Sequence, residues 1–483
     1  METKNNMKNN VFSGLIWKFA ERISAQFVTF VVSLVLARLL SPEHYGAIAI
    51  VNIFIALANV FVVSGFGNSL IQKKDSDDTD FSSVFYFSIV MSIVMYAIIF
   101  FVAPFIADFY NMPILMPVFR VLGLRLIVAG VNSVQHAYVA KHMMFRRFFW
   151  STLGGTLASG VVGIIMAYKG LGIWALVSQY MVNTTVDTIV LFITVDWKPK
   201  LLFSIKRLGR MFSYGWKLLV SSLLNTGYNE IYSLVIGKMY TPADLAFSNK
   251  GAQFPNLIVT NINSSIQSVI FPAMAAEQEK REQFKKMVRR SIRISSYIMM
   301  PLMCGLALVA KPFVELILTE KWLPCVPFLQ IACFALGFMP IHTANLQAIK
   351  AMGRSDLFLK LEIIKKIIGL SVLICIARYG VLAIALSGIF TAVVSSIINA
   401  FPNKRLIGYS YIEQIKDLLN AVIPCAIMCI VVFLIGKINI APLELIMLQI
   451  LIGAIVYICA SVITRNESFH YVLSTIKGII KTR

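Results

Sequence analysis

The chain has 483 residues, of which 58% are hydrophobic and 14% are charged, and its formal net charge is +21. A single soluble core of this length cannot bury so much apolar surface, so the composition excludes an ordinary soluble domain. The positive charge alone would suit a nucleic-acid partner, but the basic residues lie in short segments between apolar runs. That arrangement is typical of a polytopic membrane protein embedded in the lipid bilayer, and we expect no nucleic-acid partner.

Apolar runs of about 20 residues recur along the chain, and a helix of about 20 residues crosses a hydrocarbon core of about 30 Å. Lipid offers no hydrogen-bond partner to the backbone, so we expect an all-α fold. The polar start at Met1 to Asn10 and the long apolar run after it predict no cleavable signal. About fourteen transmembrane helices are predicted, over 13–40, 45–70, 81–107, 114–140, 148–168, 172–194, 211–237, 243–271, 288–310, 324–349, 356–377, 380–402, 415–436 and 442–464.

The basic residues predict how these spans are oriented. An even number of spans places both termini on one side of the membrane, and the loops on that side hold most of the 44 lysines and arginines. The loops on the other side hold only a few of them. Because basic loops stay on the cytoplasmic side, we expect both termini in the cytoplasm.

An internal repeat divides the chain. Leu36 to Gly46 (LARLLSPEHYG) aligns with Ile236 to Ala246 (IGKMYTPADLA), 200 residues later. The two copies have the same orientation, as in two-lobed transporters, and chance similarity between apolar segments is the alternative. We predict an N-terminal six-helix lobe over 1–200, a C-terminal six-helix lobe over 201–402, and two additional transmembrane helices with a cytoplasmic tail over 403–483.

The eighth predicted span carries polar side chains spaced three or four residues apart, which places them on one face of a helix. Lys250 lies at the edge of this row, and shorter polar faces recur in the first and seventh spans. Interhelical hydrogen bonds are the alternative role, but a row that crosses the membrane favours a water-accessible cavity. The predicted binding amides are Gln26, Asn225, Asn229, Asn249, Gln253, Asn256, Asn263 and Gln267.

Charged side chains deep in a membrane span are costly and normally face protein or water. The deep cations Arg22, Arg125 and Lys250 predict an anionic substrate, because a low dielectric strengthens their attraction to phosphate or carboxylate. The deep acids Glu230 and Asp187 have two interpretations that the sequence leaves open. They are either structural counter-ions of those cations or sites for a coupling proton or sodium ion.

Signatures of catalysis or of a bound metal are weak. The chain has no P-loop, and Gly170 to Ala175 fits a dinucleotide fingerprint only formally, because it lies in a tight turn between two spans. Asp75-Ser-Asp77 resembles a glycosyltransferase metal motif, but its loop is short and no nucleotide-binding domain surrounds it. Cys425 and Cys429 share a helix face, yet without a further nearby ligand we favour packing over a metal site. We therefore expect a protein that is not an enzyme, with no catalytic residue, metal or cofactor.

Two motif regions carry a family resemblance. The first is Leu36 to Gly46 with Gly65-Phe-Gly67 and Leu70 to Lys74, and the second is Ile236 to Gly251 with Phe271-Pro272. Both resemble the Wzx-like polysaccharide transporter family of oligosaccharide flippases, in the multidrug/oligosaccharidyl-lipid/polysaccharide exporter superfamily. The family usually has arginine where this chain has Lys250, a difference that keeps the charge but loses the bidentate fork.

The resemblance implies a flippase of the bacterial cytoplasmic (inner) membrane. Such a protein translocates undecaprenyl-diphosphate-linked oligosaccharide repeat units by alternating access, for O-antigen, capsule or exopolysaccharide synthesis. The resemblance further implies that residues 415–464 help form a lipid groove and that a polysaccharide polymerase and other assembly proteins are partners. Two alternatives remain. A cation-coupled drug exporter of the same superfamily is disfavoured by the excess of deep cations, and a membrane polysaccharide polymerase or ligase would need a large external loop.

Overall fold

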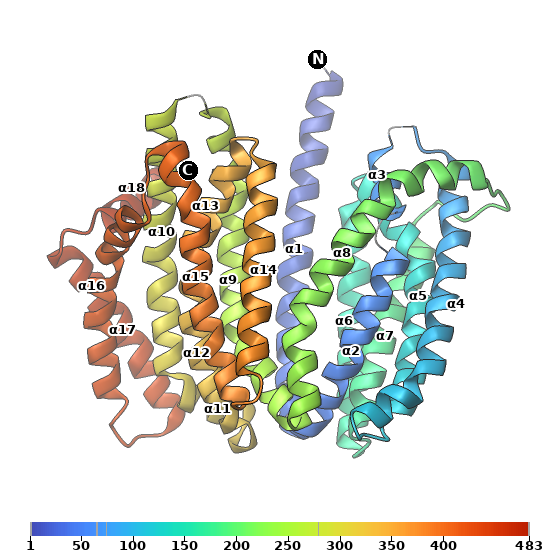
Figure 1. Ribbon diagram of the computed structural model, residues 1–483, viewed down its shortest axis with the longest axis horizontal. Coiled ribbons are helices and arrows are strands. Elements are labelled where there is room, and N and C mark those ends of the chain that lie inside the picture. Colours follow the sequence, from blue (N-terminus) through green and yellow to red (C-terminus); the bar gives the residue numbers. More distant parts are fainter. Residues whose placement is uncertain (1, 64–65, 74, 279, 482–483) are drawn as a thin grey trace. The chain divides into compact units, whose positions relative to one another are not determined.

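The computed structural model describes residues 2–63, 66–73, 75–278 and 280–481 of the chain (Figure 1). These residues form the α-helices α1 to α18 and one 3₁₀ helix, η1, and none of them lies in a β-strand. The expected all-α fold is confirmed. Contacts divide the chain into two compact units, unit 1 over Met1–Ala246 and unit 2 over Phe247–Arg483.

Unit 1 is built from the first eight helices. Helix α4 packs beside α5, α6 packs beside α7 and α1, and α2 packs against α5 and α8 (Figure 1). A buried aromatic cluster that includes Phe81, Phe85 and Trp197 holds the segment after α7 against the start of α4. The helices of unit 1 are α1 (Glu2–Leu39), α2 (Pro42–Val63), α3 (Phe66–Gln72), α4 (Asp78–Phe109), α5 (Leu115–Lys141), α6 (Phe145–Tyr168), α7 (Ile173–Thr194) and α8 (Ile205–Met239).

Local sequence explains where some of these helices begin. The Asp77 side chain accepts a hydrogen bond from the Asp80 backbone N–H at 3.0 Å, and the Asp80 carboxylate accepts one from the Asp77 N–H at 3.2 Å. This capping box starts α4. Between α6 and α7 the chain turns through Gly170 and Gly172, whose φ angles of 75° and 54° suit glycine. The dinucleotide-like segment is therefore a turn, as the sequence predicts.

Unit 2 contains most of α9 together with α10 to α18. Helix α10 packs against α12, α13 and α16, and α15 packs against α12, α13 and α14 (Figure 1). The Tyr457 hydroxyl donates a hydrogen bond to the Tyr297 carbonyl at 2.7 Å, which ties α17 to α10. The elements are α9 (Pro242–Ala276), α10 (Arg281–Leu308), α11 (Ala310–Leu318), η1 (Glu320–Cys325), α12 (Val326–Leu336), α13 (Met339–Ala351), α14 (Ser355–Ile376), α15 (Val381–Ile407), α16 (Tyr411–Ile435), α17 (Pro442–Ile463) and α18 (Glu467–Lys481).

The predicted spans coincide with helices or with pairs of consecutive helices, such as α12 and α13 for 324–349. Within the described part of the chain, 11 helical segments are long and apolar enough to cross a membrane. Helices α8, α9 and α14 match predicted spans but are not among these 11 segments. The number of about fourteen transmembrane helices therefore stays a prediction. Gly65 and Lys74 of the first motif region lie outside the described residues.

The two copies of the repeated motif form the same helix–turn–helix. Helix α1 ends at Leu39 and α2 begins at Pro42, and likewise α8 ends at Met239 and α9 begins at Pro242. Within unit 1 the starts of α2 and α9 lie in close contact. A Cβ placed on Gly46 would lie only 1.8 Å from the Pro242 carbonyl oxygen. Only glycine permits so close an approach of one helix start to the other.

The predicted lobe boundary near residue 200 lies in the irregular segment between α7 and α8. Helix α8, however, packs against α2, α3 and α4, so unit 1 includes the first helix of the predicted second lobe and extends to Ala246. The three predicted domains, 1–200, 201–402 and 403–483, stay a prediction.

Candidate functional site

Arg125 lies near the middle of α5 and reaches α7. Its Nε donates a hydrogen bond to Thr184 Oγ1 at 2.7 Å, and its guanidinium carbon lies 5.4 Å from the centre of the Tyr180 ring. No carboxylate in the described part of the chain pairs with it. A guanidinium carries five N–H donors, so the donors on its two terminal nitrogens remain for another acceptor.

Asp187, one turn beyond Thr184 on α7, bonds to two side chains of α5. Its Oδ2 accepts a hydrogen bond from Asn132 Nδ2 at 2.6 Å and lies 3.0 Å from His136 Nε2. The Asp187 side chain keeps 15% of its surface exposed. Its partners are therefore a histidine and an amide rather than Arg125. A protonated His136 makes Asp187 a counter-ion and a neutral one leaves it able to accept a proton, so both interpretations of Asp187 stay predictions.

The predicted binding residues of α1 and α8 lie on open faces. Arg22 is exposed and Gln26, one turn later, is half-buried. On α8, Asn225 and Asn229 are exposed and Glu230 is half-buried. Neither Arg22 nor Glu230 forms an ion pair with another described residue. The role of these side chains in binding stays a prediction.

Half of the polar row on α9 is exposed. Asn249, Asn256 and Thr260 are exposed, Gln253 and Gln267 are half-buried, and Asn263 is buried. Among the described residues, no hydrogen-bond partner is present for the side chains of Asn249, Gln253, Asn256 and Thr260. Side-chain amides offer both donors and acceptors, so this face can bind water or a hydroxyl-rich ligand.

Lys250 lies on the packed side of α9, away from the open amides. The residue is only 5% exposed, and its Nζ lies 5.8 Å from the centre of the Trp322 ring in η1. A Cβ on the adjacent Gly251 would lie 2.7 Å from Phe328 Cβ and 2.8 Å from the Cys325 carbonyl oxygen. The glycine thus lets α9 pack tightly on η1 and α12. Contact of Lys250 with a substrate stays a prediction.

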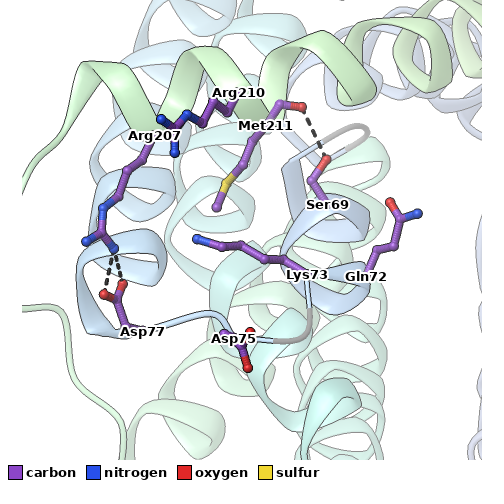
Figure 2. A pocket seen from close by; sticks show the side chains of 8 residues that line it. All are labelled: Ser69, Gln72, Lys73, Asp75, Asp77, Arg207, Arg210 and Met211. Atoms are coloured by element: carbon purple, nitrogen blue, oxygen red, sulfur yellow. Dashed lines mark hydrogen bonds and ion pairs between the residues drawn. The ribbon is translucent and has the colours of Figure 1, made fainter.

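A charged pocket lies in unit 1 where α3, the loop between α3 and α4, and the start of α8 meet (Figure 2). Its cavity has a volume of about 560 Å³. Figure 2 shows Arg207 and Arg210 on α8, with Lys73 and Asp75 on the opposite side of the pocket. The lining residues are Ser69, Gln72, Lys73, Asp75, Asp77, Arg207, Arg210 and Met211.

Ion pairs fix the wall of this pocket. Arg207 Nη1 donates to both carboxylate oxygens of Asp77, at 2.5 and 2.6 Å (Figure 2). This hydrogen bond lowers the pKa of Asp77 to about 2, so the carboxylate stays ionised at neutral pH. Lys73 forms an ion pair with the buried Asp80, whose Oδ1 lies 3.5 Å from Arg207 Nη1. In the Asp75-Ser-Asp77 motif, Asp77 therefore caps helix α4 and forms an ion pair with Arg207.

The sequence prediction missed this pocket because its walls are far apart in the chain: Asp77 and Arg207 are 130 positions apart. The usable signal was charge complementarity. Four acidic residues within 75–80 face the basic segment 198–210 that precedes and begins α8. Opposite charge in two loops on the same predicted side of the membrane favours their contact.

Three cysteines of unit 2 also come together unexpectedly. Cys304 on α10 joins Cys425 and Cys429 on α16, and the three sulfur atoms lie within 4.8 Å of one another. They belong to a core cluster with Tyr297 and Met428. Cys425 and Cys429 share a helix face as the sequence indicates, whereas Cys304 arrives through tertiary packing that no spacing reveals. The expected absence of a metal stays a prediction.

Comparison with known sequences relates the chain to polysaccharide assembly. The profile of a family described as "Polysaccharide biosynthesis protein" matches residues 35–327. Lipopolysaccharide biosynthesis protein WzxC of Escherichia coli (strain K12) is 22% identical over 416 residues, which cover 85% of this chain and 85% of WzxC. Succinoglycan biosynthesis transport protein ExoT of Rhizobium meliloti (strain 1021) is 22% identical over 342 residues, or 70% of this chain and 68% of ExoT.

Comparison with solved structures identifies a similar fold. Lipid II flippase MurJ in an inward closed conformation superposes with a TM-score of 0.76 at 16% sequence identity. The match covers 93% of this chain and 99% of that one. At this identity the likeness establishes the fold and says nothing about the substrate.

Proposed function

This chain belongs to the family of polysaccharide biosynthesis proteins, among the Wzx-like polysaccharide transporters, and from this membership we propose that it flips a lipid-linked oligosaccharide. The substrate is an undecaprenyl-diphosphate-linked repeat unit, and the protein moves it from the inner to the outer leaflet of the bacterial cytoplasmic membrane. WzxC and ExoT are named for lipopolysaccharide biosynthesis and succinoglycan transport, which supports a role in surface polysaccharide synthesis. The protein acts as a transporter and not as an enzyme.

The open amide row on α9 is the observation that supports this proposal most. Asn249 and Asn256 are exposed on a helix that is too polar to qualify as an apolar span, and neither has a partner among the described residues. An amide left in hydrocarbon without a hydrogen bond costs about 4–8 kcal/mol. Sugar hydroxyls, which donate and accept like water, satisfy the same groups during passage.

Two cations without a carboxylate partner among the described residues, Arg22 and Arg125, support an anionic headgroup. Arg22 is exposed, and Arg125 has donors to spare beyond its bond to Thr184. In this proposal both attract the diphosphate, and Lys250 is a third cation whose burial beside Trp322 makes it the least accessible. Asp187 and Glu230 are the proposed counter-ion or ion-coupling sites.

The repeated helix–turn–helix supports alternating access. The two turns have equivalent helix boundaries, and within unit 1 they meet at Gly46 and Pro242. We place the closing contact of the transport cycle at this meeting point, on the side that the basic loops predict as external. Rocking of two parallel lobes about such a contact exposes a central cavity to each side in turn.

Deletion of the gene tests this function. We expect an undecaprenyl-diphosphate oligosaccharide to accumulate in the inner leaflet, where an impermeant lectin reaches it only in inverted vesicles. A plasmid-borne copy should clear it. Accumulation of repeat units in the outer leaflet would indicate loss of a polymerase or ligase and would contradict the proposal, as would normal surface polysaccharide in the deletion strain.

A further inference from the structure

The pocket between α3, the α3–α4 loop and α8 has the size of a ligand site. Its volume of about 560 Å³ falls within the range of about 300–1,000 Å³ that small-molecule sites occupy. Ser69 Oγ donates a hydrogen bond to the Met211 carbonyl at 3.4 Å, which ties α3 to α8 (Figure 2). The Lys141 Nζ donates to the Lys73 carbonyl at 2.6 Å and to Ser76 Oγ at 2.6 Å, which holds the loop in place.

Two side chains of opposite charge, Arg210 and Asp75, line this cavity and form no ion pair with each other. Lys73 and Arg207 are matched by Asp80 and Asp77. Arg210 and Asp75 are exposed, and neither forms a hydrogen bond or an ion pair in the part of the chain that the structure describes, although the Lys141 ammonium attracts Asp75 electrostatically. Figure 2 shows Arg210 on the α8 wall and Asp75 on the opposite, loop side. A ligand that satisfies both must itself carry separated negative and positive charge.

A magnesium-bound diphosphate has this distribution of charge. Its phosphate oxygens accept hydrogen bonds from a guanidinium fork, which binds two oxygens at once. Magnesium is held by one or two carboxylates together with substrate phosphates and waters, so Asp75 suits the metal. A diphosphate without the metal meets repulsion from Asp75, and the metal without the diphosphate meets repulsion from Arg210. The complex of the two meets neither.

We propose that this pocket binds the magnesium diphosphate headgroup of the lipid-linked substrate before translocation. The assignment rests on the proposed flippase function for the identity of the diphosphate. Arg210 binds phosphate oxygens and Asp75 binds magnesium. The basic loops predict that the pocket lies on the cytoplasmic side, where such a substrate is made available. It is a loading site, separate from the amides of α9.

Binding of inorganic pyrophosphate to the purified full-length protein tests the pocket. We expect calorimetry to detect magnesium-dependent binding to the wild type. Arg210→Gln should weaken it about tenfold to a hundredfold, the loss expected for one charge-assisted contact. Asp75→Asn should remove the dependence on magnesium. The matched controls are Lys206→Gln, an exposed neighbour on α8 outside the lining, and Glu282→Gln on α10, and both should bind as the wild type does.

Failure of the wild type to bind, or equal binding by Arg210→Gln and Lys206→Gln, overturns the proposal. Thermal unfolding of each variant shows that it is folded, and Arg210→Lys replaces Arg210→Gln if the latter is not. Phosphatidylglycerol in nanodiscs distinguishes a general anionic-lipid site from a diphosphate site. Undecaprenyl diphosphate should displace pyrophosphate and phosphatidylglycerol should not; the reverse would overturn the assignment.

The outcome separates this proposal from the function on which it rests. If the protein is a flippase but the pocket is no loading site, gene deletion still accumulates the lipid-linked glycan and Arg210→Gln restores export fully. If the pocket binds magnesium diphosphate but the protein does not flip this lipid, the calorimetric difference persists while the deletion strain accumulates nothing.

Discussion

Two polar regions of this protein use the same residue types in opposite ways. Between α5 and α7, Asp187 bonds to Asn132 and lies against His136. On α9, Asn249 and Asn256 are exposed and have no partner among the described residues. A buried polar group without a hydrogen bond costs about 1–3 kcal/mol in a protein. The bond between Asp187 Oδ2 and Asn132 Nδ2 therefore stabilises the first region, whereas the amides of the second depend on an external partner. The available partners, more than the residue types, therefore distinguish a structural polar residue from a binding one.

Removing the amides of α9 should have the largest effect on transport. In the double variant Asn249→Leu with Asn256→Leu, we expect surface polysaccharide to disappear while protein level and melting temperature stay close to the wild type, because neither side chain bonds within the protein. The readouts are export in the deletion strain and thermal unfolding in detergent. If the double variant unfolds, these amides stabilise the fold. If it exports normally, they do not contact the substrate.

The opposite result is expected for the cluster of Asp187, Asn132 and His136 between α5 and α7. Asp187→Ala leaves Asn132 and His136 without their acceptor, so we expect a loss of about 1–3 kcal/mol in stability, with less protein in the membrane. Asp187→Asn keeps one acceptor oxygen and should lose less. Thermal unfolding of the two variants measures the difference. Normal stability with abolished export in both would instead identify Asp187 as an ion-coupling residue.

The packed face of α9 offers a third test. A Cβ on Gly251 would lie 2.7 Å from Phe328 Cβ and 2.8 Å from the Cys325 carbonyl oxygen. Gly251→Ala should therefore cost about 1–3 kcal/mol, the usual cost of overpacking a tight contact. Gly154→Ala on α6 is the control, because a Cβ there meets no atom within 4 Å. Equal melting temperatures for the two variants would contradict the tight packing of α9 on η1 and α12.

The sequence predicted those features that depend on neighbouring residues. Pro42 and Pro242 mark two equivalent helix starts, and the repeat around them correctly indicated equivalent turns. Gly170 and Gly172 lie in the turn expected of them. The all-α architecture followed from the lack of backbone partners in lipid. Each of these is a local property, so one stretch of sequence suffices to infer it.

Features that depend on tertiary packing could not be predicted in the same way. Lys250 was placed at the edge of the amide row, but one helical step of about 100° turns it toward Trp322. The pairing of Arg207 with Asp77 joins residues 130 positions apart. Cys304 completes a thiol cluster from a different helix. Periodicity gives the face on which a residue lies, but it does not give what packs against that face.

Arg125 shares features of both regions, and the loss of its hydrogen bond to Thr184 has the smallest expected effect. Its Nε bonds to Thr184 at 2.7 Å, yet the terminal nitrogens have no carboxylate partner among the described residues. Thr184→Val removes only the hydrogen bond, and we expect a loss of about 0.5–1.5 kcal/mol in stability with export nearly unchanged. Arg125→Lys loses the same bond and the fork but keeps the charge, so export should fall only modestly, whereas Arg125→Gln should reduce export strongly at similar stability. If Arg125→Gln and Thr184→Val lower stability equally and both export normally, Arg125 is a structural residue like Asn132, and the diphosphate must be held by other cations.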